Sequence, residues 1–262
     1  MLGWSINLFR VFGIQLAVHA SFGLLLAYYG WQGWQYGGLI GMLWSVALIV
    51  LFFGCVVLHE LGHSLTARRY GVRVPRILLL PIGGMAEMEQ IPRRPAAELL
   101  ITVAGPAVNF ALVLLLLPLV WQPLLGQVPV MEFSATDMLV QLWWGNLVMG
   151  TFNLLPVFPM DGGRIFRALL AMRLPYMRAS WWAVQVGRVL ALVFAGVAVF
   201  VYDSPLAGVL FVFIFMAAGT EYRNLLRREQ EDAYWAEVAR RATPVTPLEA
   251  DPLPPLLPQR PD

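Results

Sequence analysis

The chain of 262 residues has no lysine, one cysteine and three histidines, and its charged residues amount to only 13%. Soluble globular proteins carry about 25% charged and about 45–50% apolar residues, whereas the apolar share here is 59%. This composition excludes a disordered chain and a collagen-like fibre. The single Cys55 allows no internal disulfide, which excludes a disulfide-stapled secreted module. The composition is instead typical of a membrane protein.

Six apolar stretches are long enough to cross a membrane, which takes about 20 residues per helix. The predicted spans are residues 15–35, 39–66, 96–120, 138–156, 181–202 and 205–220. They predict an all-α polytopic membrane protein with about six transmembrane helices. We expect residues 1–220 to form the membrane domain, 221–242 a charged cytoplasmic helix, and 243–262 a proline-rich disordered tail.

The arginines indicate the orientation of these spans. All basic residues are arginines, and apart from Arg188 they lie before span one, between spans two and three or four and five, or after span six. The other loops carry only Glu132, Asp137 and Asp203 as charged residues. Because basic loops stay in the cytoplasm, we predict a multi-pass cell-membrane protein with both termini cytoplasmic, in contact with the lipid bilayer. No nucleic-acid partner is expected.

Ionisable side chains within a span are functional candidates because burying them in lipid is costly. Span two contains His59, Glu60 and His63 in the pattern H-E-x-x-H. On a helix, two histidines four residues apart share one face and can hold one metal ion, with the glutamate beside them as general base. Hydrogen-bonded core histidines are the alternative, but that leaves buried polar groups without partners. Cys55, one turn earlier, is interpreted as a core filler, and His19 as structural.

A third metal ligand is expected from span four and the residues after it. The best candidate is Asp161, because Pro156 and Pro159 break the helix before it and Gly162–Gly163 allow a tight turn after it. A carboxylate on a broken intramembrane segment is expected where it lines a cavity or binds a ligand.

The depth of these residues in the membrane is consistent with one site. Counted from Arg68 at 1.5 Å per residue, His59 and His63 lie about 8–13 Å inside the cytoplasmic boundary. Span four starts outside near Met138, so that Asp161 also arrives near the inner boundary. The site is therefore predicted in the cytoplasmic third of the bilayer.

Three motifs together resemble the site-2 protease family of intramembrane zinc metalloproteases. They are HELGH at 59–63, AGPAVN at 104–109 and NLLPVFPMDGG at 153–163. Many relatives carry a cystathionine-β-synthase-type module after the six spans. This chain departs from them, since only the proline-rich tail is expected after residue 242.

The resemblance implies a function and a role for each site residue. His59, His63 and Asp161 would bind one Zn²⁺ per chain, Glu60 would be the catalytic base, and Asn153 would hold the scissile peptide or stabilise its oxyanion. The protein would hydrolyse peptide bonds within or near the transmembrane segment of a single-span membrane protein. In the family, such substrates are anti-sigma factors, pro-sigma factors or remnant signal peptides.

Two further features are candidates for substrate binding. Residues 74–92 predict a β-hairpin or loop beside the site, whose edge near Gly83 and Gly84 would pair with an unwound substrate as an added strand. A plain cytoplasmic turn is the alternative. Asn109 is also a candidate, although an interhelix hydrogen bond beside the small Gly105 is the favoured interpretation.

Two other functions remain open at this point. A metal transporter would also place histidine and aspartate in the membrane, but it would need more polar residues toward the outer face. A catalytically silent protein that binds membrane helices would be expected to lack Glu60 or a ligand, and all of these residues are present.

Overall fold

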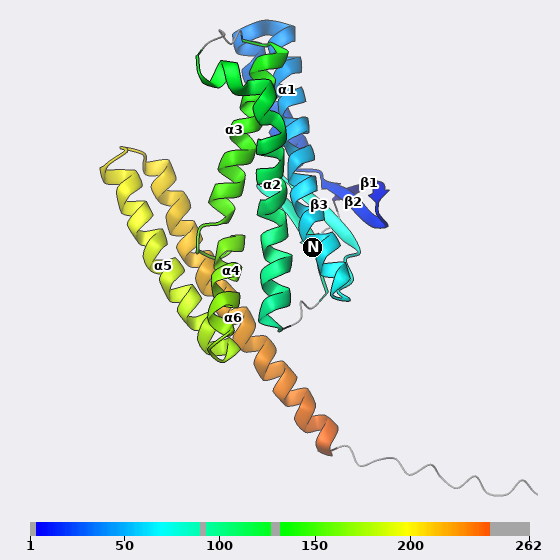
Figure 1. Cartoon of the computed structure of the whole chain (residues 1–262), viewed down its shortest axis with the longest axis vertical. Helices are drawn as coiled ribbons and strands as arrows, with labels where there is room; N and C mark the ends of the chain where they lie inside the picture. The colour runs from blue at the N-terminus through cyan, green and yellow to red at the C-terminus, as the bar shows by residue number, and fades with distance from the viewer. Residues whose placement is uncertain (1–3, 90–92, 127–131, 242–262) are drawn as a thin grey trace, which may run out of the picture. The chain divides into compact units, whose positions relative to one another are not determined.

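The computed structural model describes residues 4–89, 93–126 and 132–241, so the predicted tail lies outside the described residues. Residues Met1–Tyr222 form one compact unit and Arg223–Asp262 a second. In chain order (Figure 1) the elements are β1 (Ser5–Val11), β2 (Ile14–His19), α1 (Phe22–Arg69), β3 (Arg76–Leu80), β4 (Gly83–Glu87), α2 (Pro95–Leu124), α3 (Ala135–Asn153), α4 (Asp161–Ala171), α5 (Tyr176–Phe200) and α6 (Pro205–Arg241).

Helices dominate the described part of the chain, as the apolar composition predicts. Four of them, α1, α2, α5 and α6, are long and apolar enough to cross a membrane. Spans one and two both fall on α1, span three on α2, span four on α3, and spans five and six on α5 and α6. The predicted fold class, a polytopic helical membrane protein with a small β element, is confirmed.

Helix α1 is a helical hairpin. Its two limbs meet at Gly37 and Gly38, whose dihedral angles are not helical, and Gly38 has a φ of +58°. The limbs pack closely enough that a Cβ at Gly33 would overlap the carbonyl oxygen of Gly41. Further along, the rings of Phe22 and Phe53 meet edge to face at 4.6 Å between centroids. The hairpin brings the predicted spans one and two side by side.

The predicted start of span one at residue 15 is wrong. Residues Ile14–His19 form strand β2, which follows β1 after a turn at Phe12 and Gly13, both with positive φ. The helix begins only at Phe22. A short apolar run fits a strand as well as a helix, and here Ile14 and Leu16 alternate into the core, which is the two-residue period of a strand.

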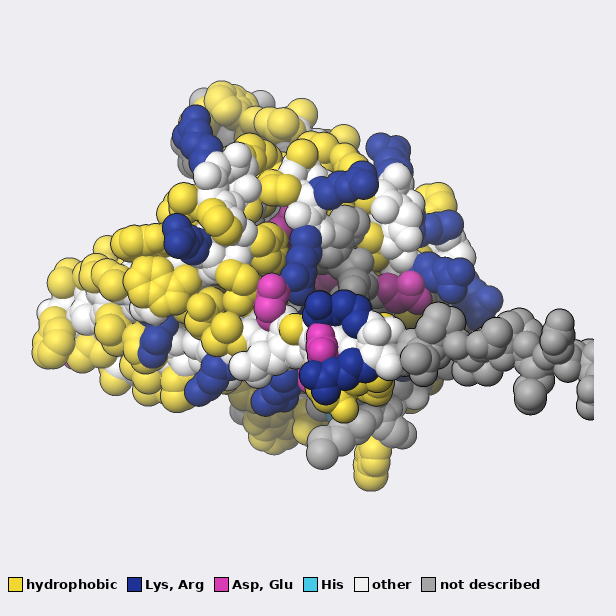
Figure 2. All heavy atoms as spheres, turned by 90° about the horizontal axis from the view of Figure 1, so that it is seen from below, with side chains coloured by type: hydrophobic (Ala, Val, Ile, Leu, Met, Phe, Trp, Pro, Cys, Tyr) yellow, Lys and Arg dark blue, Asp and Glu magenta, His cyan; other side chains and the backbone are white. Residues whose placement is uncertain are grey.

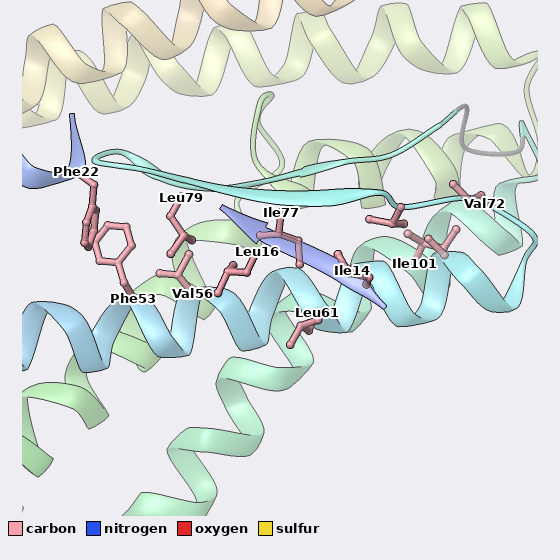
Figure 3. Close-up of a cluster of buried hydrophobic side chains, with 12 residues drawn as sticks. Ile14, Leu16, Phe22, Phe53, Val56, Leu61, Val72, Ile77, Leu79 and Ile101 are labelled. Carbon is pink, nitrogen blue, oxygen red and sulfur yellow. The ribbon is translucent and has the colours of Figure 1, made fainter. Parts of the chain in front are cut away.

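The four strands form one sheet in the order β1-β2-β3-β4. Strands β2 and β3 are parallel, and β3 and β4 form the hairpin predicted within residues 74–92, with Leu79 opposite Gly84. One sheet face packs on the second limb of α1. Figure 3 shows that contact, which includes Leu16 of β2, Leu79 of β3 and Val56 of α1. The sheet therefore lies against the helix that carries the two histidines, with β4 as an edge strand.

Helix α4, which begins with Asp161, is tied to α2 by a buried ion pair. Arg167 Nε donates a hydrogen bond of 2.8 Å to Glu98 Oε1, and both residues are at most 5% exposed. The same guanidinium lies over the rings of Phe158 and Tyr176, at 5.1 and 5.3 Å from their centroids. One arginine thus holds α4 against α2, α5 and the segment before α4.

We expect Arg167→Met to lower the free energy of unfolding by about 3–5 kcal/mol, because it leaves Glu98 charged and buried without its partner. The double variant Glu98→Leu/Arg167→Met should recover most of this loss. Thermal unfolding in detergent measures both effects. The matched control is Arg240→Met, which removes an exposed pair with Glu237 and should change stability little. Equal effects of Arg167→Met and Arg240→Met would contradict this account.

Candidate metal centre

Three side chains from two separate elements converge on one point. His63 Nε2 lies 3.1 Å from both His59 Nε2 and Asp161 Oδ2, and His59 Nε2 lies 3.3 Å from the same carboxylate oxygen. The two histidines are 3% and 6% exposed. Their spacing of four residues on α1 gives them one helix face, and α4 brings the aspartate across from its first residue.

The second nitrogen of each imidazole faces an acceptor that belongs to α2. His59 Nδ1 lies 2.6 Å from Asn109 Oδ1, and His63 Nδ1 lies 2.8 Å from the carbonyl oxygen of Ile101. Since a carbonyl oxygen can only accept, each Nδ1 carries the hydrogen and each Nε2 presents its lone pair to the point of convergence. This is the tautomer that binds a metal ion through Nε2.

The donor set fits zinc. Ligand atoms at about 2.0–2.1 Å from a tetrahedral zinc ion lie about 3.3 Å from one another, close to the three separations observed here. Two nitrogen lone pairs and a carboxylate oxygen at these distances repel each other unless a cation lies between them. Within the described residues, this is the group of histidine, cysteine or acidic side chains that could hold a metal ion, and Cys55 is not part of it.

The segment before α4 shows why two glycines follow Asp161. Residues 154–160 fold back in consecutive tight turns, with hydrogen bonds such as Met160 N–H to Val157 O at 3.0 Å. A Cβ at Gly162 would overlap the carbonyl oxygens of Leu154 and Leu155. The bare backbone at this position lets α4 begin directly beneath the broken segment, which places Asp161 opposite the histidines.

Gly105 of α2 covers one side of the site. A Cβ at this position would overlap the His63 imidazole and stand 2.8 Å from His59 Nε2. The motif AGPAVN therefore contributes in two ways: its glycine leaves room for the imidazoles, and its last residue, Asn109, accepts the hydrogen bond of His59.

Glu60 lies on the side of α1 that faces the sheet. It is half-buried, and the backbone of β4 passes so close that a Cβ at Gly84 would stand 2.6 Å from Glu60 Cγ and 3.1 Å from its Oε1. The structure thus brings Gly84 next to Glu60. The neighbouring Gly83 begins β4 with a φ of +138°.

The structure places the other predicted residues as follows. Asn153 is the last residue of α3, half-buried, immediately before the broken segment. His19 ends β2, with its Nδ1 2.7 Å from Ser21 Oγ. Asn146 of α3 was not among the predicted residues, yet it is fully buried and accepts a hydrogen bond from Asn109. An amide side chain in the middle of an apolar span was a signal for it.

Comparisons with known proteins identify the family of this chain. A model of Peptidase family M50 matches residues 47–124 and 122–194, and the chain belongs to this family of metallopeptidases, which includes the site-2 proteases. The chain is similar to the solved structure of the site-2 protease from Methanocaldococcus jannaschii, with a TM-score of 0.58 and 35% identity, over 84% of this chain and 95% of that one.

Two curated relatives extend this comparison. The zinc metalloprotease MJ0392 of Methanocaldococcus jannaschii is 40% identical over 199 residues, which are 73% of this chain and 53% of that protein. Stage IV sporulation protein FB of Bacillus subtilis is 30% identical over 194 residues, 70% of this chain and 64% of that protein. The chain thus spans between half and two thirds of the length of these relatives.

We expect Gly105→Ala to lower zinc affinity by about 10-fold or more, because the added methyl group enters the space of both imidazoles. Alanine favours a helix over glycine by about 1 kcal/mol, so weaker helix formation cannot cause such a loss. Titration of the purified variant with zinc against a competing chelator tests this. The control Gly54→Ala, on α1 with open space around its Cβ, should keep the wild-type zinc affinity. Wild-type affinity in both variants would show that a methyl group at Gly105 does not disturb the imidazoles.

Proposed function

We propose that this chain is an intramembrane zinc metalloprotease, an endopeptidase that cuts membrane-anchored proteins within or next to their transmembrane segment. The observation that carries the proposal is the convergence of His59 Nε2, His63 Nε2 and Asp161 Oδ2 within 3.3 Å, with Glu60 next to His59 in the chain and against Gly84 of β4. Three protein ligands leave one position of a tetrahedral metal for chemistry, which distinguishes a catalytic zinc site from a structural one.

Glu60 would act as the general base and acid. Zinc bound by these three ligands supplies a Lewis acid that polarises the scissile carbonyl and makes water nucleophilic near neutral pH. The Glu60 carboxylate accepts the proton of the attacking water and then delivers it to the leaving amine. Among the described residues Glu60 has no hydrogen-bonding or ion-pair partner, which leaves its carboxylate available for both steps.

Asn153 would bind the peptide at the cut site. Its amide can both donate and accept, so it can hold the peptide group or stabilise the oxyanion that develops on the carbonyl. Its position supports this role, since it ends α3 at the start of the segment that leads to Asp161.

The orientation we propose puts the site in the cytoplasmic third of the membrane, with cytoplasmic termini. The end of α1 and the starts of α2 and α5 lie in the lower half of Figure 1, and Arg93 before α2 lies over the ring of Tyr176 at the start of α5, at 5.9 Å. Figure 2 views the molecule from below and shows arginine side chains among the apolar ones on the face that it draws. His63 lies six residues before the end of α1 at Arg69, a rise of about 9 Å.

The substrate would bind in extended form along β4. A helix hides its peptide groups in hydrogen bonds, so a transmembrane substrate has to unwind before it is cut. Within the described residues, β4 pairs only with β3, and its other edge can accept an added strand. Gly84 of β4 lies against Glu60, so a strand on that edge would pass beside the general base.

We expect Glu60→Gln to abolish cleavage while zinc remains bound, because the amide keeps the shape of the side chain but cannot accept a proton. Each enzyme variant is co-expressed with a panel of tagged single-span substrates, and the masses of the products are measured by mass spectrometry. The control Glu237→Gln changes an exposed glutamate on α6 and should cleave like wild type.

The outcomes of this experiment separate the candidate functions. Products from wild type and Glu237→Gln alone support the protease and the role of Glu60. Equal cleavage by Glu60→Gln would refute the assignment of the base. Wild-type protein that holds zinc and binds substrate helices, but never cuts any of the panel, would favour a silent binding protein.

Proline substitutions test the role of the β4 edge. Adjacent residues of a strand point their N–H groups to opposite edges, so Met85→Pro and Ala86→Pro remove donors on opposite sides of β4. We expect one variant to weaken the β3–β4 pairing and lower stability, and the other to keep stability but reduce cleavage about 10-fold.

Stability is measured by thermal unfolding in detergent, and cleavage with the same substrate panel. Met85→Val and Ala86→Val serve as controls, because they keep the N–H group and a strand-favouring side chain. Cleavage at the wild-type rate by both proline variants would exclude strand addition at β4.

A further inference from the structure

A chain of two buried amides connects the metal centre to helix α3. Asn109 on α2 and Asn146 on α3 are both fully buried, with no exposed surface. Asn109 Nδ2 donates to Asn146 Oδ1 at 2.9 Å, and Asn146 Nδ2 donates to the carbonyl oxygen of Leu142 at 2.9 Å. At its other end the chain reaches His59 Nδ1, 2.6 Å from Asn109 Oδ1.

The backbone carbonyl of Leu142 sets the direction of every bond in this chain. It can only accept, so the Nδ2 of Asn146 must face it and Oδ1 must face Asn109. Asn109 then turns its own Nδ2 to this oxygen, with Met149 Sδ as a second acceptor at 3.6 Å, and presents Oδ1 to His59. If Asn146 were flipped, two oxygens would stand 2.9 Å apart at Leu142, which is repulsive.

The two histidines differ in how they are oriented. His63 Nδ1 donates to the backbone carbonyl of Ile101, which α2 holds in place whatever the side chains are. His59 Nδ1 depends on an amide side chain that could bind in either orientation. Without Asn146, nothing among the described contacts of Asn109 distinguishes its two orientations strongly, because a thioether is a weak acceptor.

We propose that Asn146 is a positioning residue of the zinc site: it fixes the Asn109 amide so that His59 keeps its hydrogen on Nδ1 and its lone pair on Nε2. This inference rests on the proposed zinc site. Partners behind a ligand of this kind commonly contribute 10–100-fold to metal affinity, about the range expected for a fixed imidazole. Among the described residues, Asn146 forms its hydrogen bonds with Asn109 and Leu142 and none with His59, His63 or Asp161.

The test is a double-mutant cycle on zinc affinity. Purified wild type, Asn109→Leu, Asn146→Leu and the double variant are titrated with zinc against a competing chelator, without any substrate. We expect Asn109→Leu to weaken zinc binding by about 10–100-fold and Asn146→Leu by about 10-fold. The double variant should bind zinc like Asn109→Leu alone, because Asn146 acts only through Asn109.

Thermal unfolding of the zinc-free proteins separates positioning from packing. Trp143→Phe is the matched control: it removes another hydrogen bond between α3 and α2, from Trp143 Nε1 to the carbonyl oxygen of Val113, so it should lower the melting temperature and leave zinc affinity unchanged. Asn146→Ala replaces Asn146→Leu if the larger side chain prevents folding.

The inference is overturned by wild-type zinc affinity in folded Asn146→Leu and Asn146→Ala. A 10-fold loss from Asn146→Leu that persists in the Asn109→Leu background also overturns it, because Asn146 would then act by another route. Wild type that binds no zinc refutes the proposed metal site itself. Wild type that binds zinc but cuts none of the substrate panel counts only against the proposed protease, since the cycle needs no catalysis.

Discussion

The arrangement of this protein depends on bringing together three groups that repel each other. Two imidazole lone pairs and a carboxylate oxygen, from His59, His63 and Asp161, stand 3.1–3.3 Å apart in a buried space. In surroundings of low dielectric constant this repulsion is larger than it is in water. The scaffold must hold the ligands in place, and the helix contacts around the site serve that requirement.

Glycine residues, which have no side chain, let the helices around the site pack closely against each other. A Cβ at Gly62 of α1 would stand 2.6 Å from the carbonyl oxygen of Ala104, so α1 and α2 pack backbone to backbone beside the site. That proximity brings the Ile101 carbonyl to His63 Nδ1 and leaves room for the imidazoles at Gly105. In a membrane, where apolar burial between helices contributes little, such small-residue packing is a main source of helix association.

The spans, the hairpin of β3 and β4, and the histidine pair could be predicted from the sequence. Each depends on the period of a helix or a strand, which is visible in residues that are close together in the chain. Asp161 could be paired with the histidines because depth along two spans limits which residues can meet. The strand at Ile14–His19 was missed, because a run this short fits the period of a strand as well as that of a helix, and contacts with the rest of the fold determine which one forms. The contact between Asn146 and Asn109 could not be predicted, since the two residues are 37 positions apart and lie on different helices.

The position of β4 links the fold to the proposed chemistry. Backbone N–H and C=O groups within a membrane must be paired, so at the proposed depth a strand edge with no partner among the described residues has to face water or another strand. Gly84 puts that edge beside Glu60. Water and an unwound peptide are the two reactants of hydrolysis. Within the described residues this edge of β4 has no partner strand, so in the proposed reaction both reactants could reach it beside Glu60. In the proposed topology, the element least suited to a bilayer is therefore the one that would receive the substrate.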